Sequence, residues 1–313
     1  MITAVELGLI YAVMALGVYL TFRILNFPDL TVDGSFTTGA ATAAILITGG
    51  TDPLLATLAA GVAGLAAGVV TGLLHTKGGI NPLLAGILTQ IGLYSINLRI
   101  MGGANVPLLR EETVLTPLRE AGLLGGAASI ALFGAIALVV KLVLDWFLHT
   151  DVGLALQATG DNEAMIRSFG VSTDRTKILG LGLSNGLVGL SGALIAQYQG
   201  FADISMGIGL IIAGLASVIL GQAILGARLI VISTFAVVAG SVLYRVAIQI
   251  ALEAGLDPND MKLVSAVLVV IALVLPQWKV FRRIPTLRSF RRSQAAAAST
   301  ADAAGVVPSR TGE

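Results

Sequence analysis

Three polar residues in an apolar part of the sequence have the type and spacing needed to hold a polar solute. Gln90, Tyr94 and Asn97 stand at positions i, i+4 and i+7 of a segment without charges, which places them on one face of a helix. Amide and hydroxyl groups both donate and accept hydrogen bonds. Such a face either lines a path for a solute or bonds to a neighbouring helix, and the spacing leaves both interpretations open.

A second polar group interrupts the apolar sequence at residues 26–35. Pro28 and Gly34 break a helix there, and irregular backbone at membrane depth is tolerated only next to protein or water. One interpretation is a broken helix that lines the path or its inner gate. Four side chains would then face the solute: Asn26, Phe27, Asp29 and Asp33. The other interpretation is an inner turn between two spans, with Asp33 as the N-cap of the following helix.

The longest polar insertion is Asp151–Lys177. It contains a helix-like piece, Asn162–Phe169, which Asp161 or Asn162 would cap and Gly170 would end. Arg167 and Glu163 lie four residues apart, so they either pair with each other or offer opposite charges to a partner surface. A short helix held parallel to a membrane is a rigid knob for a soluble partner; an ordinary loop is the alternative.

Several kinds of chemistry have no residues to support them. The chain has no cysteine, and its two histidines, His75 and His149, have no helical partner at metal-ligand spacing. We therefore predict no metal site, and both histidines are expected in solvated connections. No phosphate-binding G-x-x-x-x-G-K-[ST] motif is present. No Ser/His/Asp set or His/Asp/Glu cluster has suitable helical spacing, so we predict no catalytic residues and no enzymatic activity.

Composition indicates an integral membrane protein. Of 313 residues, 56% are hydrophobic and 12% are charged, with a net charge of +1, and the mean hydropathy is +0.90. The charged share is about half that of a soluble domain. The charges are separated along the chain rather than gathered on one face, so no nucleic-acid partner is predicted.

The apolar segments predict an all-α, polytopic transmembrane helix bundle of about nine spans, within a range of eight to ten. They are Leu7–Phe22, Gly34–Thr51, Pro53–Thr76, Gly78–Leu98, Ala121–Val140, Ile178–Ala202, Ile204–Ala227, Leu229–Tyr244 and Leu263–Trp278. Asp145 is the one acid expected within a span, near its inner end and paired with Lys141 at i,i+4 spacing. Glycines at every fourth position, such as Gly64, Gly68 and Gly72, predict closely packed helices.

Basic residues predict the orientation. The segment 282–313 begins with a group of arginines without acids, which places it in the cytoplasm, followed by a disordered tail. Counting spans backwards puts the loop 151–177 in the cytoplasm, and Arg99–Glu120 and the N-terminus outside. The domains predicted are a transmembrane permease domain, 1–281, and this basic cytoplasmic segment.

At Asp151–Lys177 the sequence also resembles a known family. The run GLALQATGDNEAMIRSFGVSTDRTKILGLGLSNGLVGLSGALIAQYQG is similar to the cytoplasmic coupling region and following helix of the branched-chain amino acid and ribose-type permeases of bacterial ABC importers. The matching positions are Gly160, Asp161, Asn162, Glu163, Ala164, Gly170, Val171, Asp174, Arg175 and Lys177. Gln222 departs from the family pattern, where a glycine is usual. The run LTFRILNFPDLTVDGSFTTGA resembles one branch, the single-permease systems linked to tryptophan- and tyrosine-like substrates.

The resemblance implies a division of labour. A dimer of permease chains, a homodimer in this branch, would form the path in the bacterial inner membrane. A separate ATPase subunit would bind and hydrolyse ATP, so this chain would need no cofactor, and an extracytoplasmic binding protein would deliver an amino acid, with an aromatic one indicated by the branch. The ATPase contact would fall on Gly160, Asp161, Asn162, Glu163, Ala164, Arg167 and Gly170. The alternative is a secondary carrier or channel that works without ATP.

Overall fold

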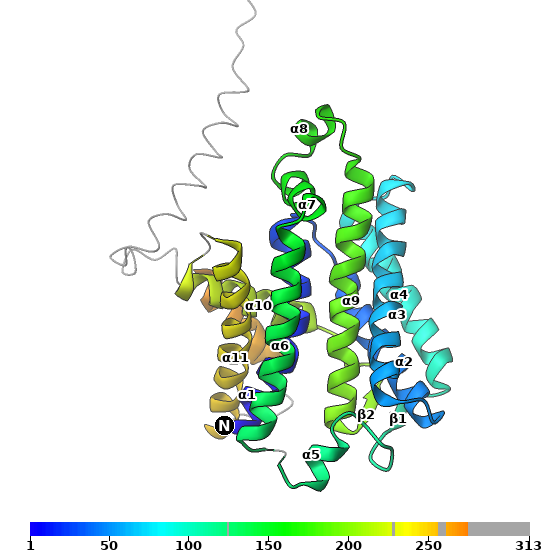
Figure 1. Ribbon diagram of the computed structural model, residues 1–313, viewed down its shortest axis with the longest axis vertical. Helices are drawn as coiled ribbons and strands as arrows, with labels where there is room; N and C mark the ends of the chain where they lie inside the picture. The colour runs from blue at the N-terminus through cyan, green and yellow to red at the C-terminus, as the bar shows by residue number, and fades with distance from the viewer. Residues whose placement is uncertain (124, 227–228, 256–260, 275–313) are drawn as a thin grey trace, which may run out of the picture.

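The computed structural model describes residues 1–123, 125–226, 229–255 and 261–274, and they form a helix bundle (Figure 1). The elements in order are α1 (Ile2–Tyr19), η1 (Leu20–Ile24), α2 (Thr31–Thr48), α3 (Pro53–Thr76), α4 (Pro82–Met101), β1 (Asn105–Pro107), α5 (Thr116–Glu120), α6 (Ala127–Leu148), α7 (Asp151–Asp161), α8 (Glu163–Ser168), α9 (Thr173–Gln199), β2 (Phe201–Asp203), α10 (Leu210–Leu225), α11 (Ile230–Glu253) and α12 (Met261–Val274). The predicted all-α class is confirmed.

Each of the nine apolar segments coincides with a helix, but the helices differ in length. Among the described residues, six helices are long and apolar enough to cross a membrane: α1 with η1, α3, α4, α6, α9 and α11. The helix predicted from Ile204 instead begins at Leu210 and has 16 residues, because residues 201–209 form β2 and turns. The predicted count of nine spans stays a prediction.

Two mostly buried helices, α1 and α9, form the centre of the bundle, and α9 packs against α1, α2 and α3. The glycine stripe of α3 explains how closely α9 approaches. A Cβ on Gly64 or Gly68 would clash with the carbonyl oxygens of Asn185 or Leu181. Without a hydrophobic drive between helices in lipid, such close backbone packing stabilises the pair. The prediction of close packing is confirmed.

The two ends of the bundle carry different structures (Figure 1). At one end, α7 and α8 project beyond the bundle. At the other lie the N-terminus, α5 and a two-stranded antiparallel ribbon in which Asn105 faces Asp203 and Pro107 faces Phe201. The loops predicted to lie inside and outside are therefore at opposite ends. The segment 282–313, on which the orientation depends, and the end of the ninth apolar segment lie outside the described residues.

Candidate functional site

The polar insertion folds into two helices rather than an ordinary loop. Asn162 is the N-cap of α8, where its side chain accepts a hydrogen bond from the backbone N–H of Met165 at 3.0 Å. Asp161 is the last residue of α7. Gly170, just after α8, has φ +85°, a left-handed conformation that glycine adopts without a steric penalty. The predicted helix and its glycine end are confirmed, and of the two predicted caps Asn162 is the one used.

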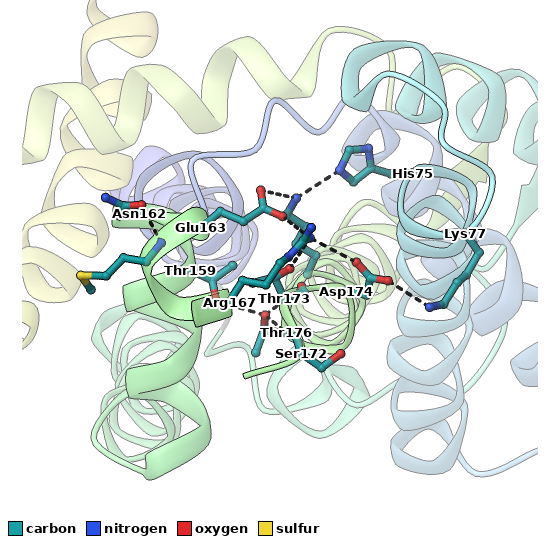
Figure 2. A network of polar contacts seen from close by, with 12 residues as sticks. His75, Lys77, Thr159, Asn162, Glu163, Arg167, Ser172, Thr173, Asp174 and Thr176 are labelled. Carbon is teal, nitrogen blue, oxygen red and sulfur yellow. Dashed lines mark hydrogen bonds and ion pairs between the residues drawn. The ribbon is translucent and has the colours of Figure 1, made fainter. Parts of the chain in front are cut away.

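Ion pairs and hydrogen bonds connect α8 to the start of α9 (Figure 2). Glu163 accepts a hydrogen bond from Arg167 at 3.0 Å and another from Lys177 of α9 at 2.7 Å. Arg167 also donates to the hydroxyl of Thr173 at 2.8 Å. Of the two interpretations of the Glu163–Arg167 pair, the structure shows the intramolecular one, extended by Lys177. The hydrogen bond from Lys177 holds the pKa of the Glu163 carboxyl below its ordinary value.

The same group of contacts reaches the end of α3. Lys77 forms an ion pair with Asp174 of α9 at 2.9 Å, and Lys177 lies 3.4 Å from Nε2 of His75 (Figure 2). His75 is not a solvated loop residue, since its ring packs edge-on against Phe27 with centroids 5.2 Å apart. These contacts connect α8 to α9 and α3, two closely packed helices of the bundle.

The outer surface of α8 carries apolar side chains that the sequence analysis did not single out. Phe169 is 74% exposed and Met165 is 47% exposed, and Ala164 beside them is also exposed. Their signal in the sequence was the group of large apolar residues Met165, Ile166 and Phe169 within the short polar segment 162–170. Gly160 does not share this surface, because a Cβ there would clash with the carbonyl oxygen of Ile24 in η1. Gly160 lies where α7 packs closely against η1.

The predicted polar face of α4 borders a cavity of about 420 Å³. Gln90, Tyr94 and Asn97 all line it, together with Asp33 from α2. The prediction that these three residues share a face is confirmed. The apolar part of the wall includes Ile91, Ile204 and Ile208. A cavity of this size falls within the range of about 300–1,000 Å³ that is usual for small-molecule sites.

Asp33 does not have the role that the turn interpretation gave it. The N-cap position of α2 is Leu30, without a side-chain cap bond, so that part of the turn interpretation is wrong. Its carboxylate instead accepts hydrogen bonds from the backbone N–H groups of Gly209 at 2.7 Å and Ile211 at 2.9 Å. These donors lie at the start of α10, where helix N–H groups lack partners within the helix. Asp33 thus caps a helix 176 residues away in sequence.

The other three residues predicted for the path lie outside this cavity. Asn26 has φ +53° and Phe27 is buried against His75. Asp29 is fully buried and accepts hydrogen bonds from the backbone N–H of Thr31 at 2.9 Å and from the amide of Asn185 at 2.7 Å. The segment therefore connects η1 to α2 through packed protein, which favours the turn interpretation, and a path role for these three residues stays a prediction.

Buried acids are more common than the sequence indicated. The pair Lys141–Asp145 is confirmed at 2.5 Å. The expectation that Asp145 is the one acid within a span is wrong, because Glu6 of α1 is 1% exposed. Its carboxylate accepts hydrogen bonds from Tyr198 at 2.6 Å, from the backbone of Gly125 at 3.0 Å and from the Ser129 hydroxyl. Glu6 was missed because the predicted apolar segment began one residue after it, although Ile2–Val5 already belongs to the helix.

No three His, Asp or Glu side chains come together as a metal site in the part of the chain that the structure describes. Two features remain as functional candidates: α8 with its contacts at one end, and the cavity between α2 and α4. Both can be compared with known proteins.

Residues 1–274 match the family described as the permease component of branched-chain amino acid transport systems. The chain belongs to this family. The tyrosine transport system permease protein of Clostridioides difficile (strain R20291) is 43% identical over 272 residues, covering 87% of this chain and 90% of that protein. The autoinducer 2 import system permease protein LsrC of Salmonella paratyphi B is 29% identical over 214 residues, covering 68% and 60% of the two chains.

A solved structure, PsaBC from Streptococcus pneumoniae in complex with Fab, shares the fold. Its TM-score is 0.52 at 16% identity, and the match covers 93% of this chain and 94% of that chain. This permease family is a family of ABC-type transport subunits, not an enzyme family, and its members work with an ATPase and a substrate-binding protein. The chain is accordingly a multi-pass protein of the bacterial inner membrane.

Proposed function

We propose that this chain is the permease subunit of an ABC importer that carries an amino acid into the cytoplasm with ATP hydrolysed by a separate subunit. The observation that carries the proposal is α8. It projects from one end of the bundle, exposes Phe169 and Met165, and is bonded through Glu163 to α9. An exposed apolar knob with a rigid connection to the core suits a soluble partner whose movement must reach the membrane helices.

An aromatic amino acid is the proposed substrate. The support is the tyrosine transport system permease at 43% identity and a cavity whose wall combines Gln90 and Tyr94 with three isoleucines. A homodimer is proposed for the path, since Tyr94 of the cavity wall is 49% exposed in the single chain and α4 is mostly unburied. ATP belongs to the partner subunit in this proposal, and the permease chain itself needs no cofactor.

The test is reconstitution in proteoliposomes. The chain is co-purified with its ATPase, the binding protein is added, and uptake of radiolabelled L-tyrosine is measured with ATP, with a non-hydrolysable analogue, and with proton and sodium gradients collapsed. Uptake should require hydrolysable ATP and survive the loss of both gradients. A gradient-driven uptake by the permease chain without an ATPase would overturn the proposal and favour a secondary carrier.

A further inference from the structure

The wall of the cavity contains a buried hydrogen-bond acceptor without a donor. Asn97 is 0% exposed, and its amide nitrogen points to the carbonyl oxygen of Gly34 at 3.5 Å. The carbonyl can only accept, so this contact favours the orientation in which the amide nitrogen faces Gly34. The amide oxygen then has no hydrogen-bond partner among the described residues. Buried acceptors are nearly always satisfied, and because Asn97 lines the cavity, a donor on a molecule in the cavity would satisfy this oxygen.

A negative charge lies in the same wall. The carboxylate of Asp33 holds Gly209 and Ile211 through one hydrogen bond to each oxygen. Each carboxylate oxygen has about two acceptor positions, so the carboxylate can accept from a further donor while α10 stays capped. Asp33 lies on α2 one residue before Gly34, the residue that Asn97 contacts. Asp33 and Asn97 both line the cavity.

The rest of the wall is consistent with a cationic group and not with an anion. Among the described residues that line the cavity there is no lysine or arginine. The N-terminus of α10, which would attract an anion, is already occupied by Asp33. The apolar side chains Ile91, Ile204 and Ile208 provide contact surface for the remainder of a solute.

We propose that this cavity binds the primary ammonium group of a transported solute between the Asp33 carboxylate and the Asn97 amide oxygen, with the apolar part of the solute against the isoleucines. The inference rests on the proposed function, because it assigns the site to the transported amine. An ammonium group has three N–H donors, enough for the Asn97 oxygen and for the Asp33 carboxylate. A carboxylate on the solute is not required by this site.

The test uses the absence of native cysteine. Ser95, an exposed residue of the cavity wall, is changed to Cys in the permease–ATPase complex in nanodiscs without binding protein, and the rate of maleimide labelling is measured. Tyramine and L-tyrosine should slow the labelling, whereas 3-(4-hydroxyphenyl)propionate, which lacks the amine, should not. Glu112→Cys, exposed and outside the cavity, is the matched control and should be unaffected by all three compounds.

Two variants in the Ser95→Cys background complete the test. Asn97→Leu removes the acceptor. Asp33→Asn removes the charge and keeps one acceptor oxygen for α10, with the loss of one of its two backbone hydrogen bonds. Each should raise the half-protecting concentration of tyramine by about tenfold to a hundredfold, as expected for a lost hydrogen bond to a charged group. If either variant fails to assemble with the ATPase, the other variant decides alone.

Equal protection by the carboxylate compound, no protection by tyramine, or an unchanged half-protecting concentration in the assembled variants would overturn the inference. ATP-dependent uptake of L-tyrosine by the same wild-type complex, with its binding protein added back in proteoliposomes, separates this failure from failure of the proposed function. If ATP-dependent uptake is intact but tyramine does not slow the labelling, only the proposed ammonium site is overturned. Uptake that does not depend on ATP removes the importer proposal, whatever the labelling shows.

Discussion

At the scale of single residues, Gly170 is a position of the candidate docking segment where the backbone restricts side-chain choice directly. With φ +85°, a β-branched residue would be strained by about 1–2 kcal/mol. We expect Gly170→Val to misplace the end of α8 and to reduce ATPase co-purification several-fold without loss of membrane insertion. The control is Ser168→Val, at an exposed position of α8 with helical backbone, which should co-purify normally. Normal co-purification of Gly170→Val would contradict a docking role for this helix end.

Glu163 gives a second residue-scale prediction, on pH. Its folded-state pKa is lowered by the hydrogen bond from Lys177, so its contribution to stability is present above the ordinary Glu pKa of about 4.3 and is lost as pH falls through the lowered value. Glu163→Gln should reduce the melting temperature at pH 7 by a few degrees at most, because exposed ion pairs contribute about 0–1 kcal/mol. The difference between variant and wild type should shrink as pH falls below the ordinary Glu pKa. A difference that does not change with pH would assign the effect to packing.

At the scale of elements, the α3–α9 contact depends on glycine. Gly68→Ala places a methyl group against the carbonyl oxygen of Leu181, and overpacking of this kind costs about 1–3 kcal/mol. Gly134→Ala of α6 is the matched control, since its Cβ would meet only Leu9 at 3.9 Å and alanine favours a helix. Thermal unfolding in detergent should show a lower melting temperature for Gly68→Ala alone. Equal melting temperatures of the two variants would mean that the added methyl group does not destabilise the contact between α3 and α9.

The elements also show how much of the structure can be predicted from the sequence. Hydropathy located every long helix, and the spacing of Gln90, Tyr94 and Asn97 placed them on one cavity wall, because both features are local. The cap that Asp33 provides to α10, the short ribbon of β1 and β2 and the site of Glu6 depend on residues about 95 to 192 positions apart. No local pattern records such partners, so Asp33 was assigned to the nearest helix and Glu6 was left outside its span.

At the scale of the whole molecule, the predicted orientation requires α8 and the loop near α5 to lie at opposite ends of the bundle, where Figure 1 shows them. Ala164→Cys on α8 and Glu112→Cys near α5 are both exposed, and the chain has no other cysteine. With intact cells and a membrane-impermeant maleimide, we expect labelling at position 112 and none at 164 until the cells are opened. The reverse pattern would place α8 outside and remove the ATPase from its proposed position.

The importer proposal is tested most directly by the segment that would transmit the ATPase movement. Residues 162–170 are replaced by a flexible Gly/Ser segment of equal length, and ATP-dependent uptake of L-tyrosine is measured in proteoliposomes with the ATPase and binding protein. We predict that the variant inserts into the membrane, with the labelling of Glu112→Cys unchanged, but that uptake is lost or is uncoupled from ATP hydrolysis. Uptake at the wild-type rate would contradict coupling through α8 and would favour a carrier that works without ATP.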